Sequence, residues 1–326
     1  VAHSGTQAFL AALEEQQKAG GDVNLIGQFG VGFYSAFLVA DRVDVLSRRA
    51  GTDEAWLWQS DAHDAYSIKG GTRDTHGTSI ILYFKEEHKE MLSTWRVREL
   101  ITKYSDYVSY PVLLEEIKLP NPDDADAEPT LEYQQVNSGK ALWQRPKSEI
   151  EKEEYDAFYQ HLTHDYQEPV AYKHFTVEGT QLFTGLLFVP PRAPFDLYSA
   201  EHRRGIRLYV KRVFIMDDCQ EFIPPWLRFV KGVVDSDDLP LNISREILQD
   251  SRMVKAIQKQ LVKKSLDMLD ELAADEEKYA TFWETFGAVV KEGFHYSRES
   301  HERLGKLARY KSSHDPEAWT SIPEYI

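Results

Sequence analysis

A glycine-rich loop near the start of the chain has residue types and spacing that could bind phosphate. Gly27, Gly30 and Gly32 come directly before an apolar stretch, Phe33 to Val39, which is typical of a helix. Glycines there let a ligand approach the backbone, and free N–H groups at a helix N-terminus favour an anion. No Gly-Lys-Ser/Thr follows, and Ser35 stands where a dinucleotide fingerprint has its third glycine. Phosphate binding and a simple tight turn therefore both remain open from the spacing alone.

A second segment places an arginine where a loop is expected to lead into a helix. Arg245 stands between Asn242 and Gln249 in the stretch Leu-Pro-Leu-Asn-Ile-Ser-Arg-Glu-Ile-Leu-Gln, residues 239–249. A guanidinium group is planar and permanently charged, so it could stabilise a phosphate during its transfer. From this segment alone, an ion pair with an acidic neighbour is the simpler explanation.

Three aromatic residues lie near prolines and could anchor a partner. They are Trp143, Phe195 in Pro-Pro-Arg-Ala-Pro-Phe, and Trp226 in Phe-Ile-Pro-Pro-Trp. Aromatic side chains on stiff loops are frequent anchors of protein interfaces, and equally frequent core residues beneath a loop. Both roles stay open. We expect no metal site, because His161 and His164 have no third ligand at a suitable spacing.

Composition limits the function classes. The 326 residues suffice for roughly two domains, and 53 acidic against 38 basic residues give a net charge of −15. Such a chain is poorly suited to bind nucleic acid through phosphates. Cys219 is the one cysteine, which excludes an internal disulfide and suits a reducing compartment. The apolar stretch 25–40 is too short and too rich in glycine to span a bilayer.

The elements that must position these residues fall into two α+β units. The first, residues 1–118, is expected to contain a helix capped by Ser4, strands at 43–47, 55–59 and 79–84, and a helix that ends before Pro111. Residues 119–138 hold three prolines and five carboxylates and indicate an exposed linker. The second unit, 139–326, is expected to be α/β to about 249 and helical over about 250–310. Its expected elements are a helix capped at 148–151, strands at 172–177, 181–189 and 206–215, and helices from 251, at 276–294 and at 300–310.

Two long stretches resemble the heat-shock protein 90 chaperones. The first is Asn24 to Val43, which contains Gly27-Gln28-Phe29-Gly30-Val31-Gly32-Phe33. The second runs from Arg207-Leu208-Tyr209-Val210-Lys211-Arg212-Val213-Phe214-Ile215 through Trp226 to Gly232-Val233-Val234-Asp235-Ser236 and on to Arg245-Glu246. The short linker resembles bacterial HtpG-type members or the mitochondrial relative.

The resemblance implies the C-terminal part of a GHKL-type ATP-binding α/β sandwich, followed by an α/β middle domain with a helical segment. Its implied ATP-binding residues are His3, Gly27, Gln28, Phe29, Gly30, Val31, Gly32, Phe33 and Thr78. Arg245, with Asn242 and Gln249, would stabilise charge in the transition state at the γ-phosphate. His3 stands where the family usually has Lys or Arg, and imidazole is mostly uncharged at neutral pH, so that contact would be weaker.

The resemblance also places the catalytic glutamate, the magnesium-binding asparagine and the adenine-reading aspartate upstream of this sequence, and the dimerisation domain downstream. It implies an internal piece of a homodimeric, ATP- and Mg²⁺-dependent chaperone of the bacterial cytoplasm, or alternatively of the mitochondrial matrix. Its partners would be unfolded clients and co-chaperones, without nucleic acid or membrane. The piece alone is expected to be inactive as an ATPase.

The alternative is a non-enzymatic module that binds clients or co-chaperones. A mismatch-repair or topoisomerase ATPase is disfavoured by the acidic charge of the chain.

Overall fold

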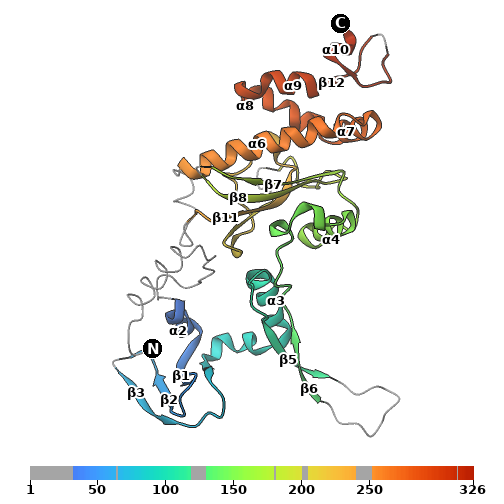
Figure 1. The fold of residues 1–326 in the computed structure, drawn as a ribbon. Helices are drawn as coiled ribbons and strands as arrows, with labels where there is room; N and C mark the ends of the chain where they lie inside the picture. The colour runs from blue at the N-terminus through green and yellow to red at the C-terminus, as the bar shows by residue number, and fades with distance from the viewer. Residues whose placement is uncertain are drawn as a thin grey trace, which may run out of the picture. The chain divides into compact units, whose positions relative to one another are not determined.

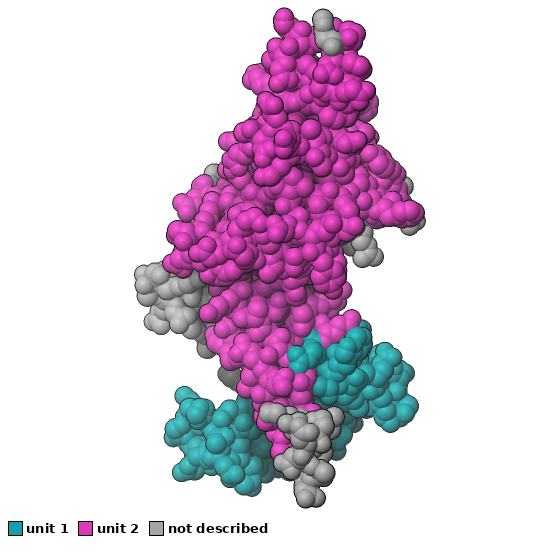
Figure 2. All heavy atoms as spheres, turned by 90° about the vertical axis from the view of Figure 1, so that its right-hand side faces the viewer, with its two compact units in different colours: residues 1–98 teal, residues 99–326 magenta. Residues whose placement is uncertain are grey.

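The computed structural model describes residues 32–63, 65–118, 130–179, 181–199, 205–239, 252–313 and 315–326. The structure is compatible with the predicted α+β class, because runs of mostly antiparallel strands are followed by runs of helices (Figure 1). The chain divides into two compact units, Val1–Arg98 and Glu99–Ile326, coloured separately in Figure 2. Each unit is described by itself.

The first unit is built on a four-stranded antiparallel sheet in the order β3-β2-β1-β4. Its elements are η1 (Gly32–Ser35), α2 (Ala36–Val39), β1 (Ala40–Arg48), β2 (Ala55–Ser60), β3 (Tyr66–Gly71), β4 (Gly77–Phe84), η2 (Glu86–Leu92) and the start of α3 (Thr94–Ser105). The three predicted strands are confirmed as β1, β2 and β4. The fourth strand, β3, was not predicted.

A hairpin of β5 (Leu113–Lys118) and β6 (Thr130–Gln135) follows in the second unit. The sequence analysis assigned residues 119–138 to an exposed linker and did not predict the strand β6 within it. The side chain of Asn137 closes the base of the hairpin: its Oδ1 accepts the Val112 N–H at 2.8 Å, and its Nδ2 donates to the Val108 carbonyl at 3.0 Å. The segment is exposed, as predicted, but it is hydrogen-bonded β-structure.

The second unit has a five-stranded sheet in the order β10-β9-β11-β8-β7, in which β11 is parallel to β9 and antiparallel to β8. The strands are β7 (Ala171–Val177), β8 (Phe183–Val189), β9 (Ile206–Val210), β10 (Val213–Met216) and β11 (Lys231–Ser236). Before and between them lie η3 (Leu142–Gln144), η4 (Lys147–Glu149), α4 (Lys152–Thr163) and η5 (Pro225–Leu227). After them come α6 (Arg252–Leu272), α7 (Glu276–Lys291), α8 (Gly293–Tyr296), η6 (Arg298–Ser300), α9 (His301–Leu307), β12 (Arg309–Tyr310), β13 (Thr320–Ser321) and α10 (Ile322–Tyr325).

Helices cover both faces of this sheet, with α6 on one side and α4 on the other (Figure 1). Successive residues of a strand point to opposite faces. Leu187 and Val234 therefore pack in the cluster that contains α6 and α7, whereas Leu186 and Val233 pack in the cluster that contains α4. Burial on both faces explains why every residue of β8 is buried. None of the described helices combines the length and the apolar character that crossing a membrane requires.

Two local predictions in this unit were wrong. The strand expected over 206–215 is a hairpin, in which Lys211 (φ +50°) and Arg212 (φ +67°) form a left-handed turn between β9 and β10. Neither residue is the glycine or asparagine that such turns usually carry, so the sequence gives no turn signal. The cap of α4 is Glu151 rather than Ser148, and the Glu151 N–H donates to Glu154 at 3.1 Å.

The segment before the hairpin also packs in the second unit. The ring of Tyr107 lies 4.6 Å from that of Trp143, and both are buried. The first compact unit thus ends at Arg98, before the domain boundary that was predicted at residue 118. That boundary stays a prediction.

Candidate functional site

Of the predicted ATP-binding residues, Gly32, Phe33 and Thr78 lie within the described part of the chain. His3 and residues 27–31, which carry the rest of the predicted set, lie outside it. Gly32 begins η1, and its carbonyl accepts the hydroxyl of Ser35 at 2.6 Å. The structure therefore locates only the end of the predicted phosphate loop.

Phe33 and Thr78 lie on the same face of the first sheet. The ring of Phe33 packs edge-on against Trp58 at 5.7 Å between centroids, and Trp58 pairs with Val45. Thr78 pairs with Ser47, two residues along β1, and the two hydroxyl oxygens are 2.9 Å apart. Directly paired residues and residues two apart share a face in an antiparallel sheet. The face is apolar at Trp58 and offers an exposed hydroxyl at Thr78.

The opposite face of this sheet holds a polar cluster that the sequence analysis did not identify. Asp44 is 5% exposed and accepts two hydrogen bonds from Arg42, at 2.8 and 2.7 Å, and one from Gln59 at 2.7 Å. The hydrogen bonds from Arg42 lower the pKa of Asp44 most strongly, against the opposing effect of burial. The signal in the sequence was the alternation of Arg42 and Asp44 with Val43 and Val45. Within this cluster Gln59 and Asp44 are directly paired, so their hydrogen bond joins β2 to β1.

In the second unit, the predicted catalytic residues Asn242, Arg245 and Gln249 lie outside the described residues. The structure shows how the chain before them is held. The hydroxyl of Ser236, the last residue of β11, accepts the N–H groups of Asp238 at 3.3 Å and Leu239 at 3.2 Å. Leu239 is 2% exposed and belongs to the core that contains α6.

Asp235, beside Ser236, is a buried carboxylate with three hydrogen-bond donors. It is 1% exposed. Its Oδ2 accepts the indole N–H of Trp143 at 2.9 Å and the side-chain amide of Gln144 at 3.0 Å. Its Oδ1 accepts the main-chain N–H of Arg212 at 3.1 Å, in the left-handed turn. Asp235 thus joins η3, the β9–β10 turn and the end of β11.

The sequence analysis did not identify this role of Asp235. The available signal was a charged residue directly after Val233 and Val234, because a carboxylate in a buried strand needs partners.

The three candidate aromatic anchors separate clearly. Trp143 and Trp226 are each 1% exposed and pack in the two cores of the second unit, so of the two roles left open the core role holds for both. The indole N–H of Trp143 is satisfied by Asp235, which makes deep burial of its ring possible. Phe195 is fully exposed, on the loop that follows β8.

Two further observations concern reactive groups. Cys219 is completely buried, and burial is the main cause that raises the pKa of its thiol. Among the residues that the structure describes, no three His, Cys, Asp or Glu side chains gather in a way that could hold a metal ion.

The sequence matches one known protein family and, along its whole length, several members of that family. The Hsp90 protein family matches residues 121–326. The Chaperone protein HtpG of Myxococcus xanthus is 54% identical over 331 residues, which cover 100% of this chain and 50% of that protein. Those of Actinobacillus succinogenes and Coxiella burnetii are 48% and 47% identical, each over 100% of this chain and 52% of the relative. The chain spans about half the length of the curated relatives it matches, and it belongs to the Hsp90 protein family.

Proposed function

We propose that this chain is part of an ATP-dependent molecular chaperone that binds and remodels client proteins. The observation that carries the proposal is the match along 100% of the chain, at 54% identity, to a protein named Chaperone protein HtpG. The relatives come from bacteria, which favours the bacterial cytoplasm over the mitochondrial matrix. The parent protein is proposed to form a homodimer outside these residues.

We assign the nucleotide site to a GHKL-type sandwich that includes the first sheet. Residues 27–33 would hold the phosphates through main-chain N–H groups, with His3 nearby and Thr78 toward the adenine. The common face of Phe33 and Thr78 supports this assignment, because one ligand can reach both from the same side. The residue that would hold Mg²⁺ lies upstream of the chain.

Arg245 is the proposed catalytic residue of the second unit, with Asn242 and Gln249 beside it. A guanidinium group held near a transferring phosphate lowers the barrier by stabilising the charge that develops there. The anchoring of residues 236–239 supports the role, because a fixed starting point limits where the following residues can reach.

The experiment is steady-state ATP hydrolysis by the parent protein that contains this chain. Arg245→Ala should lower kcat by roughly tenfold or more, with little change in KM, because the lost interaction is made mainly in the transition state. Arg252→Ala is the matched control, since Arg252 is exposed at the start of α6. Unchanged turnover of Arg245→Ala would remove Arg245 from the catalytic assignment.

The second candidate function is a non-enzymatic module that binds clients or co-chaperones, and Phe195 favours it. The ring of Phe195 is fully exposed, so its apolar surface is removed from water only when a partner covers it. Suppression of the aggregation of a heat-denatured model protein by this chain, without ATP, measures the activity. Phe195→Ser should weaken it, whereas Tyr166→Ser, at another highly exposed aromatic, should not. Equal behaviour of the two variants would exclude Phe195 as the contact.

A further inference from the structure

The loop that carries Phe195 is exposed at its tip and buried just beyond it. Its described part runs from Pro190 to Ser199, after β8. Phe195 is fully exposed, whereas Leu197, two residues on, is completely buried. The Leu197 N–H donates to the Pro194 carbonyl at 3.0 Å, so the tip is a tight turn. A fixed point thus lies next to the exposed ring.

Arg228, which follows η5, binds this fixed point. Its Nε donates to the Leu197 carbonyl at 2.7 Å, and its Nη1 donates to the Pro225 carbonyl at 2.8 Å. Nη1 and Nη2 also form a bidentate pair with the carboxylate of Glu292, at 2.6 and 2.8 Å. One side chain therefore connects the loop, η5 and the junction between α7 and α8.

The surroundings make this connection strong and specific. The Arg228 side chain is only 13% exposed, so its ion pair with Glu292 is poorly screened by water. The hydrogen bonds that Arg228 donates to Glu292 raise the pKa of Arg228, against the effect of burial. A lysine could keep the charge opposite Glu292 but has no planar fork to reach the carboxylate and the Leu197 carbonyl at once.

An exposed aromatic ring lies over the same guanidinium group, and a second exposed ring belongs to α8. The Tyr198 ring lies 5.5 Å from Arg228, and Tyr296 ends α8, four residues after Glu292. Tyr198 is 64% exposed and Tyr296 58%. With Phe195 they offer apolar and aromatic surface on a rigid base, which suits an extended segment with exposed apolar side chains better than a charged or folded partner.

We propose that Arg228 is a positioning residue: by binding the Leu197 carbonyl and the Glu292 carboxylate at once, it fixes the 190–199 loop so that Phe195 can bind apolar segments of unfolded clients. The inference rests on the proposed client-binding function. Preorganisation of this kind saves the entropy that a free loop would lose on binding.

A spin label on the loop tests the positioning role directly. Phe195→Cys provides the only accessible thiol, since Cys219 is buried. The motion of the loop contributes to the mobility of this exposed label, so its rotational correlation time is expected to shorten at least about twofold when Arg228→Lys is added. The pair Arg228→Met with Glu292→Gln, which removes both charges and leaves neither one unpaired, should act in the same way.

Tyr166→Cys is the control site for the label, because Tyr166 is 90% exposed and lies outside the loop. Its spectrum should stay unchanged in both Arg228 backgrounds. A rotational correlation time at position 195 that stays the same in either folded variant overturns the positioning role, whatever the chaperone assay shows.

The aggregation assay separates this inference from the function on which it rests. In the chain with Phe195 present, Arg228→Lys should weaken suppression of aggregation about as much as Phe195→Ser does. If Phe195→Ser has no effect, the client contact fails. If Phe195→Ser weakens the activity and Arg228→Lys does not, the contact stands and the positioning role is overturned.

Discussion

The indole N–H of Trp143 donates to Oδ2 of Asp235 at 2.9 Å, across 92 residues of sequence. Through this bond, and through the carbonyl of Trp143, which accepts His174 at 2.9 Å, η3 is held to two strands of the central sheet. The hydrogen bonds at Asp235 close the end of β11, from which the chain continues toward Arg245.

Removal of this junction should destabilise the fold substantially. Asp235→Ala leaves three donors without an acceptor and should lower the free energy of unfolding by roughly 3 kcal/mol. Trp143→Phe removes only the indole donor and should cost less. Urea unfolding of both single variants and the double variant gives the coupling energy. Strictly additive costs would show that the two side chains do not act together, and Glu153→Gln on the exposed side of α4 is the control.

His174 should make stability depend on pH below neutrality. It is 7% exposed; its Nε2 donates to the Trp143 carbonyl, so its Nδ1 accepts the Tyr155 hydroxyl at 2.9 Å. Burial lowers the pKa of His174 from its ordinary value of 6.5. As the pH falls, the unfolded chain therefore binds the proton before the folded one does. Stability should be full above about pH 6.5 and decline as the pH falls toward the folded pKa.

Urea unfolding at several pH values between 5 and 8 measures this effect. His174→Gln should flatten the decline, whereas His63→Gln, on an exposed turn, should leave it unchanged. An identical decline in the His174 variant would assign the pH dependence to other groups.

Gly232 should not tolerate a side chain. Its φ is +154°, and an added Cβ would lie 2.3 Å from the Leu186 carbonyl oxygen, in the adjacent strand β8. Gly232→Ala should therefore separate the two strands and cost roughly 3 kcal/mol. Gly305→Ala in α9 is the matched control, because its added methyl group meets nothing within 4 Å and should stabilise the helix by about 0.5–1 kcal/mol. Equal melting temperatures of the two variants would contradict the close approach.

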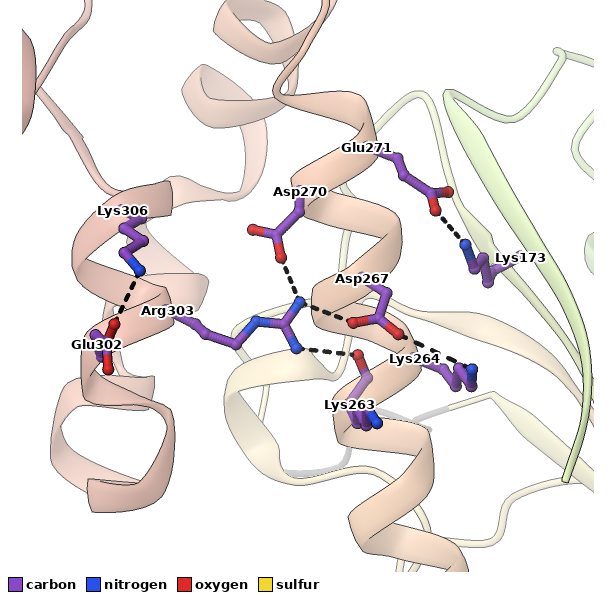
Figure 3. A network of polar contacts seen from close by, with 9 residues as sticks. All are labelled: Lys173, Lys263, Lys264, Asp267, Asp270, Glu271, Glu302, Arg303 and Lys306. Atoms are coloured by element: carbon purple, nitrogen blue, oxygen red, sulfur yellow. Dashed lines mark hydrogen bonds and ion pairs between the residues drawn. The ribbon is translucent and has the colours of Figure 1, made fainter.

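Arg303 should link α9 to α6 in a salt-dependent way. Its guanidinium contacts Asp267 at 2.9 Å and also Asp270, both on α6 (Figure 3). The side chain is 31% exposed, so water screens the pair partly, and Arg303→Ala should cost about 1 kcal/mol at low salt. Lys306→Ala breaks an exposed pair within α9, and its effect should be small. Thermal unfolding at low and high salt compares the two; an Arg303 effect that does not shrink with salt would point to packing instead.

Most elements with a clear period were predictable, and those without one were not. The alternation in residues 43–47 and the helical spacing of Val254, Ile257 and Leu261 correspond to β1 and α6. β3 and β6 were missed because exposed edge strands have no buried face to create an alternation. The break at Lys211 was missed because tertiary hydrogen bonds, from Arg212 to Asp235 and from Lys211 to Ser236, hold a turn that its residues do not favour.

The candidate site likewise contains residues that the sequence indicated and residues that it did not. Motif resemblance named Phe33 and Thr78, and the register of the sheet places them on one face. No local pattern indicates that Asp235 accepts a hydrogen bond from Trp143, or that Arg228 donates one to the Leu197 carbonyl. In both cases the partner lies far away in sequence. Trp226 and Phe195 have similar proline-rich surroundings in the sequence. Only their burial in the structure shows that Trp226 is a core residue and Phe195 an exposed one.

The position of β11 between β9 and β8 also sets the order in which the second unit can be completed. The hairpins β7–β8 and β9–β10 are local and can form as soon as their residues leave the ribosome, but each then has an open edge. Only β11, made last and inserted between them, covers both edges. The sheet therefore cannot be completed before β11 is present, and until then each hairpin keeps an unpaired strand edge that can pair with another molecule.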